Sequence, residues 1–276
     1  MRLALKLIGV LPLRKMSYIL GLFAGIRLPK PILSFIIRRY CRFYHVNMGE
    51  SLFPIEAFAT MQDFFTRELK GGCRPIRDGL ISPVDGRIEQ MGYIKDGTLL
   101  QVKGKAYQLC DLIPDNYIAS SFANSWYCSI YLAPGDYHHI HSPVSGRIKT
   151  TYLIPGTLWP VNSWSVRHVD RVFCRNERIV TIIKNQSSEV CLVCVGATNV
   201  GSILLHYDDI VANRSFFLPT KETKKDYEKE ISVDKGSKVA SFRLGSTVIM
   251  LIKDDKFSPI SSLKGTVKMG ETLGYG

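Results

Sequence analysis

The pattern of hydrophobic and polar residues divides the chain into two parts. Through about residue 65 the pattern predicts short helices, which Pro12, Pro29 and Pro31 separate, with the last one expected over residues 55–69. From about residue 80 it changes to short apolar and β-branched runs punctuated by glycine and proline, which predict strands. These runs cover residues 127–133, 179–183, 190–195, 202–206 and 247–252.

The clearest amphipathic pattern lies in residues 32–44. At about 100° per residue, seven apolar residues fall within an arc of roughly 140°, and three arginines fall on the other side. The apolar residues are Ile32, Leu33, Ile36, Ile37, Tyr40, Phe43 and Tyr44, the arginines are Arg38, Arg39 and Arg42, and only Phe35 breaks the pattern. Such a stripe fits packing on the protein's own core as well as contact with a membrane.

Two segments of the β-rich part repeat. Residues 82–88 (SPVDGRI) and 142–148 (SPVSGRI) agree at six of seven positions. Proline with glycine three residues later suits a turn into a strand, so we predict two similar β-hairpin units. The differing position is Asp85 in one copy and Ser145 in the other. A purely structural repeat gives no reason for a single carboxylate, which favours a role for Asp85.

These patterns predict an α+β protein. Helices in residues 1–65 precede a β-rich domain in residues 66–276, built as a barrel or sandwich with an internal repeat. The mostly charged residues 221–230 are expected to form a solvated loop or a short exposed helix. The chain has 276 residues, 46% of them hydrophobic, which is enough for one sizeable core. Its seven cysteines are odd in number and mostly embedded in apolar sequence, which is typical of reduced thiols facing the cytosol.

The net charge of +12 is concentrated at the N-terminus. Residues 1–49 contain nine lysines and arginines and no acid, which leaves only +3 for the rest of the chain. The segment is also rich in Leu, Ile and Phe, so it indicates an anionic membrane surface and not nucleic acid. Its longest uncharged run, residues 16–26, has eleven residues, whereas a spanning helix needs about 20. We therefore expect the segment to lie on a membrane without crossing it.

Candidate chemistry centres on Gly245-Ser246, just before the apolar run at 247–252. Glycine leaves its own carbonyl open to attack, and the serine hydroxyl one residue downstream can attack it in an N→O acyl shift. A serine needs a base for this, and a base works best when a carboxylate fixes its tautomer. His141 and Asp85 can fill these roles. Each also has an ordinary structural explanation, as a histidine at a strand end and as a turn residue.

Together these segments make the chain resemble the bacterial-type phosphatidylserine decarboxylases. The matching segments are FFTR at 64–67, PVDG at 83–86, Asp-Tyr-His-x-x-His-x-Pro at 136–143, LWPVN at 158–162, NER at 176–178, VGAT at 195–198, GSI at 201–203 and LGST at 244–247. One stretch departs from the family, which usually reads Lys-Gly-x-Glu-x-Gly-x-Phe before the cleavage site. Here Lys238 replaces the acid and Ala240 the second glycine, which puts in doubt any role for an acidic side chain at 238.

The resemblance implies a proenzyme that cuts itself between Gly245 and Ser246. The products would be a β chain of residues 1–245 and an α chain of residues 246–276 that begins with a covalent pyruvoyl group derived from Ser246. Asp85 and His141 would activate the serine for this step. The two chains would remain together as a heterodimer or within a higher homo-oligomer.

The resemblance also implies the reaction, in which phosphatidylserine forms a Schiff base with the pyruvoyl group. This group withdraws electrons as carbon dioxide leaves, and phosphatidylethanolamine is released. His138 is the candidate proton donor, since a histidine titrates near neutral pH. His139 matches no fixed family position and is expected at the surface. No metal is implied, and the enzyme would work peripherally on the cytoplasmic face of the bacterial cell membrane.

Two other functions fit parts of the sequence. His139 and His141, with Asp85 upstream, could belong to a metallopeptidase zinc site, which would need a third ligand and an open position. The basic N-terminus could instead be the whole function of a non-enzymatic membrane-binding module. Only the decarboxylase hypothesis requires the chain to be found in two pieces.

Overall fold

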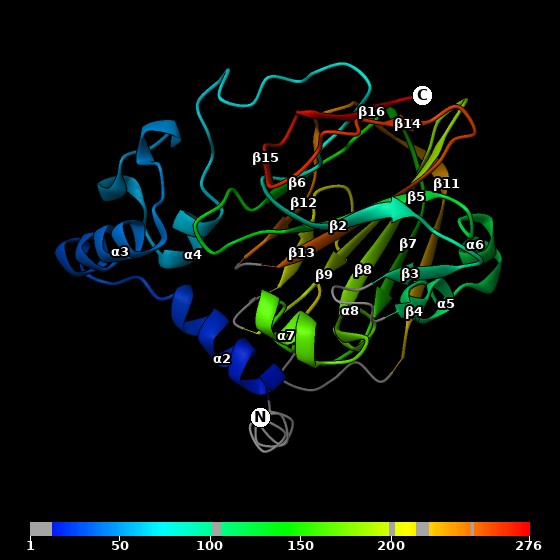
Figure 1. The fold of residues 1–276 in the computed structure, drawn as a ribbon. Helices are drawn as coiled ribbons and strands as arrows, with labels where there is room; N and C mark the ends of the chain where they lie inside the picture. Colours follow the sequence, from blue (N-terminus) through cyan, green and yellow to red (C-terminus); the bar gives the residue numbers. More distant parts are fainter. Residues whose placement is uncertain (1–12, 101–105, 199–201, 214–220, 244–245) are drawn as a thin grey trace.

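Helices come first along the chain and strands follow, as the computed structural model shows (Figure 1). The structure describes residues 13–100, 106–198, 202–213, 221–243 and 246–276. The N-terminal elements are α2 (Leu13–Ala24), α3 (Lys30–Tyr44), η1 (Met48–Glu50), η2 (Ile55–Ala57) and α4 (Met61–Phe65). Four further short helices lie between strands: α5 (Leu109–Leu112), α6 (Asn116–Ser121), α7 (Ser163–His168) and α8 (Val172–Arg175).

An antiparallel sheet of eight strands forms the centre of the protein. In spatial order the strands are β11 (Thr223–Val233), β7 (Gly146–Ile154), β8 (Arg178–Lys184), β9 (Glu189–Val195), β13 (Thr247–Lys253), β5 (Trp126–Tyr131), β2 (Gly86–Tyr93) and β15 (Thr266–Val267). The central strand β13 pairs with β5 on one side and β9 on the other, so its apolar run is buried. This explains why apolar and β-branched runs predicted these strands.

Smaller sheets complete the β-rich part. A three-stranded sheet has the order β10 (Ile203–Leu205), β12 (Lys238–Phe242), β6 (His139–His141), and another has the order β1 (Leu80–Ile81), β16 (Thr272–Tyr275), β14 (Ser258–Pro259). β3 (Thr98–Leu100) and β4 (Ala106–Gln108) form a hairpin. The α+β class is thus confirmed. Among the described strands, β11 and β15 form two separate edges of the large sheet, and no closed barrel is shown.

The repeated sequence corresponds to a repeated turn. Ser82 and Ser142 each donate a hydroxyl hydrogen bond to the carbonyl two residues on, at 2.7 and 2.6 Å. A strand begins four residues after each serine, at Gly86 and at Gly146. The likeness that the described residues show is in this turn and strand start, and they do not show a duplicated domain.

Two expected elements differ from the structure. The helix expected over 55–69 is broken into η2 and α4, because Thr60 caps α4 at its start and the chain is extended again where Leu69 bridges to Ser51. The charged segment expected as a loop or helix at 221–230 is largely strand β11. β11 lies at an edge of the sheet, where charged side chains reach solvent, so it lacks the apolar alternation of a half-buried strand.

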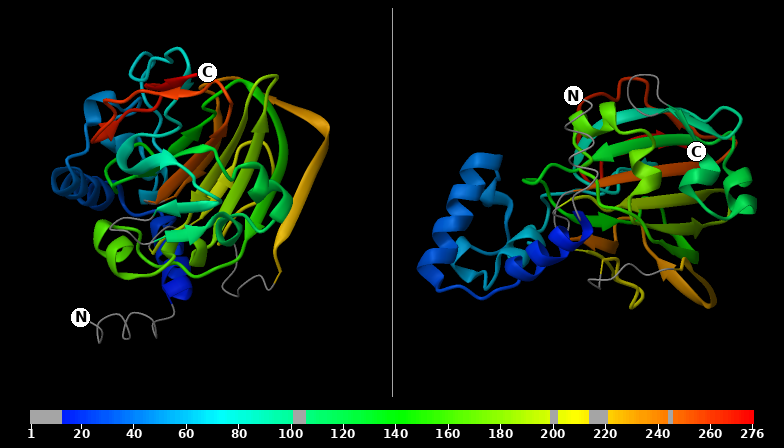
Figure 2. Two further views of the ribbon diagram at one scale, coloured as in Figure 1. Left: turned by 45° about the vertical axis from the view of Figure 1, so that its right-hand side comes forward. Right: turned by 90° about the horizontal axis from the view of Figure 1, so that it is seen from below.

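The helical region has a small hydrophobic core of its own, centred on Leu33, Ile37, Phe58 and Phe64. Both views in Figure 2 show α3 and its neighbours standing beside the strands. The predicted stripe on α3 is therefore divided: Leu33 and Ile37 face this core, whereas the rest of its apolar surface lies outward. The outward residues include Ile32, Phe35, Ile36 and Phe43.

α2 is attached to the strands by a buried ion pair. Arg14 is 6% exposed and pairs with the buried Glu177, which precedes β8. Arg14 therefore belongs to the interior, unlike the other basic residues expected at a surface. Within the described residues, no helix is both long enough and apolar enough to cross a membrane.

Candidate active site

Ser246 lies at the entrance to the central strand β13. Its side chain is fully buried, and its carbonyl accepts a hydrogen bond from the Leu132 amide at 2.8 Å. The next residue, Thr247, pairs with Tyr131 on β5 and with Val195 on β9, so the backbone is fixed on both sides. Gly245, the other half of the predicted cleavage site, lies outside the described residues.

The hydroxyl of Ser246 has no hydrogen-bond partner among the described residues. Most buried polar groups are paired, because leaving one unpaired costs about 1–3 kcal/mol. The described residues include three other buried hydroxyls without a partner, on Ser129, Ser202 and Thr247, and the Ser246 hydroxyl is the one at the predicted scissile bond. Because the Ser246 hydroxyl has no partner in this part of the structure, a group derived from the serine would fit there without breaking a side-chain hydrogen bond.

His138 lies on the loop that faces Ser246. This loop, residues 132–138, joins β5 to β6, and two backbone hydrogen bonds tie it to the segment carrying Ser246. One runs from the Leu132 amide to the Ser246 carbonyl, and the other from the Phe242 amide to the His138 carbonyl, at 2.9 Å. The fold thereby places the loop that carries His138 beside the segment that carries Ser246, although the two residues are 108 positions apart in the sequence.

The tautomer of His138 follows from its hydrogen bond. Nδ1 lies 2.8 Å from the carbonyl of Asp136, and since a carbonyl only accepts, Nδ1 carries the proton. Nε2 is then an unprotonated acceptor, buried and without a partner among the described residues. Burial and the nearby charge of Arg67 lower the pKa of His138 to about 3. The ring is therefore neutral at physiological pH, with a free lone pair on Nε2.

Arg67 holds this loop in place. Arg67 is 5% exposed, and its Nη2 donates to the carbonyls of Gly135 and Asp136, at 2.7 and 3.1 Å. The Asp136 carbonyl thus receives hydrogen bonds from both Arg67 and His138. Sequence reasoning included Arg67 only as part of the FFTR match. Its role was not predictable because its partners are backbone carbonyls about 70 residues away.

His141 is also buried and neutral. Its Nδ1 donates to the carbonyl of Gly236 at 2.6 Å, and its Nε2 lies 3.2 Å from the hydroxyl of Tyr137. Burial lowers the pKa of the ring below its ordinary value. A backbone carbonyl therefore fixes the tautomer of His141, the task that the sequence assigned to Asp85.

Asp85 instead contacts Arg74. Its carboxylate accepts from Arg74 Nε at 2.8 and 3.0 Å and from Nη2 at 2.5 Å, and Oδ1 also accepts from the Met269 amide at 2.8 Å. Lys268 Nζ lies 3.6 Å away. Among the described contacts no hydrogen bond joins Asp85 to His141. Its negative charge nevertheless acts on the ring and opposes the lowering of the His141 pKa.

The repeat explains one of these contacts. Ser145, at the equivalent position of the second copy, accepts a hydrogen bond from the Lys235 amide at 2.9 Å, as Asp85 does from Met269. Each donor precedes a glycine with positive φ, Gly236 at 84° and Gly270 at 91°. Both positions therefore hold a turn, and the carboxylate of Asp85 in addition accepts hydrogen bonds from Arg74 on both of its oxygens.

The expectation that His139 lies at the surface is wrong. It is 4% exposed, because β6 pairs with β12 and places it opposite Ser241. His139 Nε2 donates to the carbonyl of Thr66 at 3.1 Å, which leaves Nδ1 to accept from the Ser241 hydroxyl at 2.6 Å. His206 Nε2 lies 2.6 Å from the same hydroxyl. Nearby, Lys238 forms an ion pair with Glu68.

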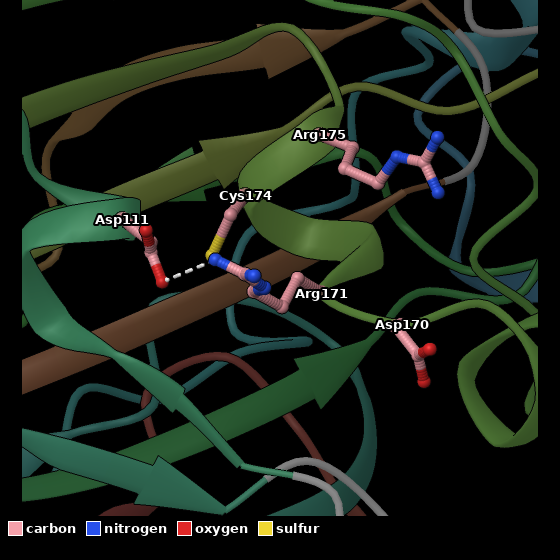
Figure 3. Close-up of a pocket in the computed structure, with 5 residues that line it drawn as sticks. All are labelled: Asp111, Asp170, Arg171, Cys174 and Arg175. Carbon is pink, nitrogen blue, oxygen red and sulfur yellow. Dashed lines mark hydrogen bonds and ion pairs between the residues drawn. The ribbon is translucent and has the colours of Figure 1, made fainter.

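Two other features of the described residues bear on the chemistry. No three His, Cys, Asp or Glu side chains there are grouped so that they could hold a metal ion. A pocket of about 400 Å³ lies beside α8 and includes Cys174, and Arg171 donates to Asp111 across it at 3.1 Å (Figure 3). Burial raises the pKa of Cys174 to about 12, so the thiol is not a nucleophile at neutral pH. None of the predicted site residues lines this pocket.

Comparison with known proteins identifies the family. The sequence model of the family described as phosphatidylserine decarboxylase matches residues 61–275. A phosphatidylserine decarboxylase proenzyme from Myxococcus xanthus is 36% identical over 275 residues, covering 98% of this chain and 97% of that protein. One from Chromobacterium violaceum is 39% identical over 271 residues, covering 96% and 95%. The chain therefore belongs to the phosphatidylserine decarboxylase family, whose pyruvoyl-dependent members are made as proenzymes.

Proposed function

We propose that this phosphatidylserine decarboxylase matures by cutting its chain between Gly245 and Ser246, giving chains 1–245 and 246–276. The observation that carries the proposal is the Ser246 hydroxyl, which is buried and unpartnered among the described residues, beside a loop that holds a neutral histidine. The hydroxyl attacks the Gly245 carbonyl and forms an ester. Elimination and hydrolysis then leave a pyruvoyl group at position 246 and release ammonia.

His141 is the proposed base for this step. It is neutral, and the Gly236 carbonyl holds the proton on Nδ1, which leaves Nε2 unprotonated, 3.2 Å from the Tyr137 hydroxyl. Asp85 acts through its charge, which favours the protonated ring once His141 has taken the serine proton. Arg74 and the Met269 amide hold Asp85 in place for this role.

In the decarboxylation itself, the pyruvoyl group supplies an electrophilic carbonyl that accepts the electrons left by carbon dioxide. We assign proton transfer to His138. Its Nε2 takes a proton from the substrate ammonium and returns it to the carbon that has lost carbon dioxide. The fixed proton on Nδ1 and the hydrophobic surroundings, with the Phe65 ring 6.1 Å away, suit repeated transfer through Nε2 alone.

The N-terminal region, residues 1–65, is the proposed membrane-associating part, and residues 66–276 form the catalytic part. The described helices of the N-terminal region expose many large apolar side chains, namely Met16, Ile19, Leu20, Leu22, Phe23, Ile32, Phe35, Ile36 and Phe43. Arg39 and Arg42 lie among them on α3 and attract anionic lipid. These side chains support peripheral membrane contact, and we place the enzyme on the cytoplasmic face of the bacterial membrane.

Replacement of the serine tests this function. Ser246→Ala is expected to stay as one chain of 276 residues and to release no carbon dioxide from phosphatidylserine, because a methyl group cannot attack a carbonyl. Ser129→Ala is the matched control, since Ser129 is another buried hydroxyl without a partner in the described structure. It should cleave and turn over normally. Full activity of an uncut Ser246→Ala chain would disprove the proposal.

A further inference from the structure

A cavity of about 360 Å³ lies between the N-terminal helices and the strand ends beside Ser246. Tyr40 and Tyr44 of α3, Phe65 of α4 and Tyr131 of β5 form much of its wall. Two of these residues lead directly to the active site. Tyr131 pairs with Thr247, the neighbour of Ser246, and the Phe65 ring faces the ring of His138.

The wall is well ordered by internal contacts. The rings of Tyr40 and Tyr44 are 4.4 Å apart, and those of Tyr40 and Phe65 are 5.1 Å apart. The Tyr40 hydroxyl donates to the carbonyl of Pro134 at 2.8 Å, on the same loop as His138. At Gly135 a Cβ atom would lie 2.5 Å from the Tyr44 carbonyl, so only glycine permits this close packing. The end of α3 and the His138 loop are thus joined along the cavity.

The side chains that line the cavity determine which part of a ligand can bind there. The described residues that line the cavity are aromatic, apolar or neutral polar, and none is charged. A phosphate or carboxylate loses its hydration there without gaining a cation, which is unfavourable. An uncharged ester and the first methylene groups of a fatty chain bury apolar surface instead. The cavity also adjoins α3, whose Phe43 is 73% exposed on the proposed membrane side.

We propose that this cavity binds the uncharged diacylglycerol portion of phosphatidylserine, while the serine headgroup reaches position 246. This inference rests on the proposed function, and it identifies which part of the substrate the cavity binds. The cavity orients the lipid as it leaves the bilayer, so it contributes to affinity for the acylated substrate and not to the chemical step.

Truncation of Tyr44 tests the proposal. Tyr44→Ala removes an aromatic wall that is already 39% exposed, so the fold should tolerate it. Activity is measured on dihexanoyl phosphatidylserine dissolved as monomers, which separates cavity binding from membrane binding. We expect KM to rise about tenfold with little change in kcat, the loss typical of one aromatic contact. Tyr44→Phe keeps the ring and should restore KM.

Glycerophosphoserine provides the discriminating measurement, because it has the same headgroup and no acyl chains. Its inhibition constant should be the same for Tyr44→Ala and the wild type. The control Tyr117→Ala removes an aromatic side chain that is 85% exposed on α6 and should change neither value. An unchanged KM, or an equal loss for both compounds, would overturn the proposal.

The extent of self-cleavage, measured by mass, is recorded for every variant. Cleaved and active variants with unchanged KM would reject the cavity while leaving the proposed function intact. A wild-type chain that stays uncut would reject the proposed function itself. Tyr44→Leu, a smaller change, is tested alongside; if both Tyr44 variants remain uncut, Tyr44 serves cleavage and the proposal is wrong.

Discussion

At the scale of single residues, His138 and His141 have the same charge state but different surroundings. Each has its proton fixed on Nδ1 by a backbone carbonyl. The Nε2 of His141 meets the Tyr137 hydroxyl, whereas that of His138 has no partner within the described structure. This difference fits two separate tasks. It also makes the division of labour between them testable.

Replacement of each histidine should separate the two steps. His141→Ala should block or greatly slow self-cleavage, because the serine loses its base. His138→Ala should still cleave but lose turnover by at least about 100-fold, the contribution typical of general acid–base catalysis. Cleavage is measured by gel and mass, and turnover by release of carbon dioxide. If His138→Ala remained uncut and His141→Ala did not, the base for Ser246 would be His138.

Asp85→Asn should also slow cleavage, but by a different route. The amide keeps the hydrogen bond from the Met269 amide but removes the negative charge that favours protonated His141. It also leaves Arg74 with Glu50 as its remaining carboxylate partner. Asp85→Glu, which retains the charge, should be faster than Asp85→Asn. Equal cleavage rates for the two variants would contradict a role for the charge.

The lowered pKa of His138 predicts how stability depends on pH. Its folded pKa of about 3 lies below the unfolded value of 6.5, so the unfolded chain binds the proton more readily. The stabilisation by a neutral ring is therefore complete above about pH 6.5 and is lost as pH falls towards 3, by roughly 1 kcal/mol per pH unit. The uncut Ser246→Ala protein, unfolded by urea at pH 7.5 and 5, gives the measurement. Adding His138→Gln should reduce the pH dependence, and an unchanged dependence would contradict a buried neutral ring.

The sequence indicated candidate residues for the site but not the contacts that these residues make. Ser246, His138 and His141 lie on segments whose residue types already suggested chemistry. The actual partners of Asp85 and His139 could not be predicted, because Met269 is 184 positions from Asp85, and Thr66 and Ser241 are 73 and 102 positions from His139. These groups come together only in the folded protein, so no local sequence pattern indicates their contacts.

At the scale of elements, the loop between β5 and β6 carries His138, the proposed proton donor. Arg67 bonds two of its carbonyls, yet Nε and Nη1 of the same guanidinium have no described partner. The residue is 5% exposed, and this burial lowers the pKa of Arg67 below its ordinary value. Arg67 thus positions the loop at a cost to its own solvation.

Arg67→Met should therefore harm activity more than stability. The variant loses two hydrogen bonds, but it also removes the desolvation penalty of a buried charge. We therefore expect the free energy of unfolding to change by no more than about 1 kcal/mol. Turnover should fall roughly 10- to 100-fold, because a small displacement of His138 is enough to misalign it. Arg67→Lys should recover part of the turnover. A loss of stability with unchanged turnover would show that Arg67 is purely structural.

Elements could be predicted where burial leaves a pattern. The strands β8, β9 and β13 follow from continuous apolar runs because each is buried in the sheet. The edge strand β11 has no such pattern, since its charged side chains are solvated and its pairing with β7 is held by backbone bonds. The helix α4 is shorter than its periodicity suggested because Thr60 begins it and the chain turns extended after Thr66.

At the scale of the whole molecule, the helices beside the strands are the proposed link between the active site and the lipid. Deleting residues 1–45 is not a clean test, because it would leave Glu177 buried without Arg14. Reversal of Arg39 and Arg42 to Glu avoids this, and it also spares Arg38, which pairs with Glu56. We expect weaker binding to anionic vesicles, a smaller salt dependence and normal self-cleavage.

A matched control reverses two exposed lysines elsewhere. Lys229 on β11 and Lys253 on β13 give the same change in net charge when replaced by glutamate. Vesicle sedimentation at several salt concentrations compares the two pairs. If both pairs weaken binding equally, only total charge matters and the helices are not the membrane-facing surface.

The most direct test of the central claim is the intact mass of the purified wild-type protein. Self-cleavage should give two chains, one ending at Gly245 and one of 31 residues starting at position 246. The small chain should lack a free amino terminus, and its mass should match a pyruvoyl group in place of the serine. A fully active protein that consists of a single uncut chain of 276 residues would contradict the central claim.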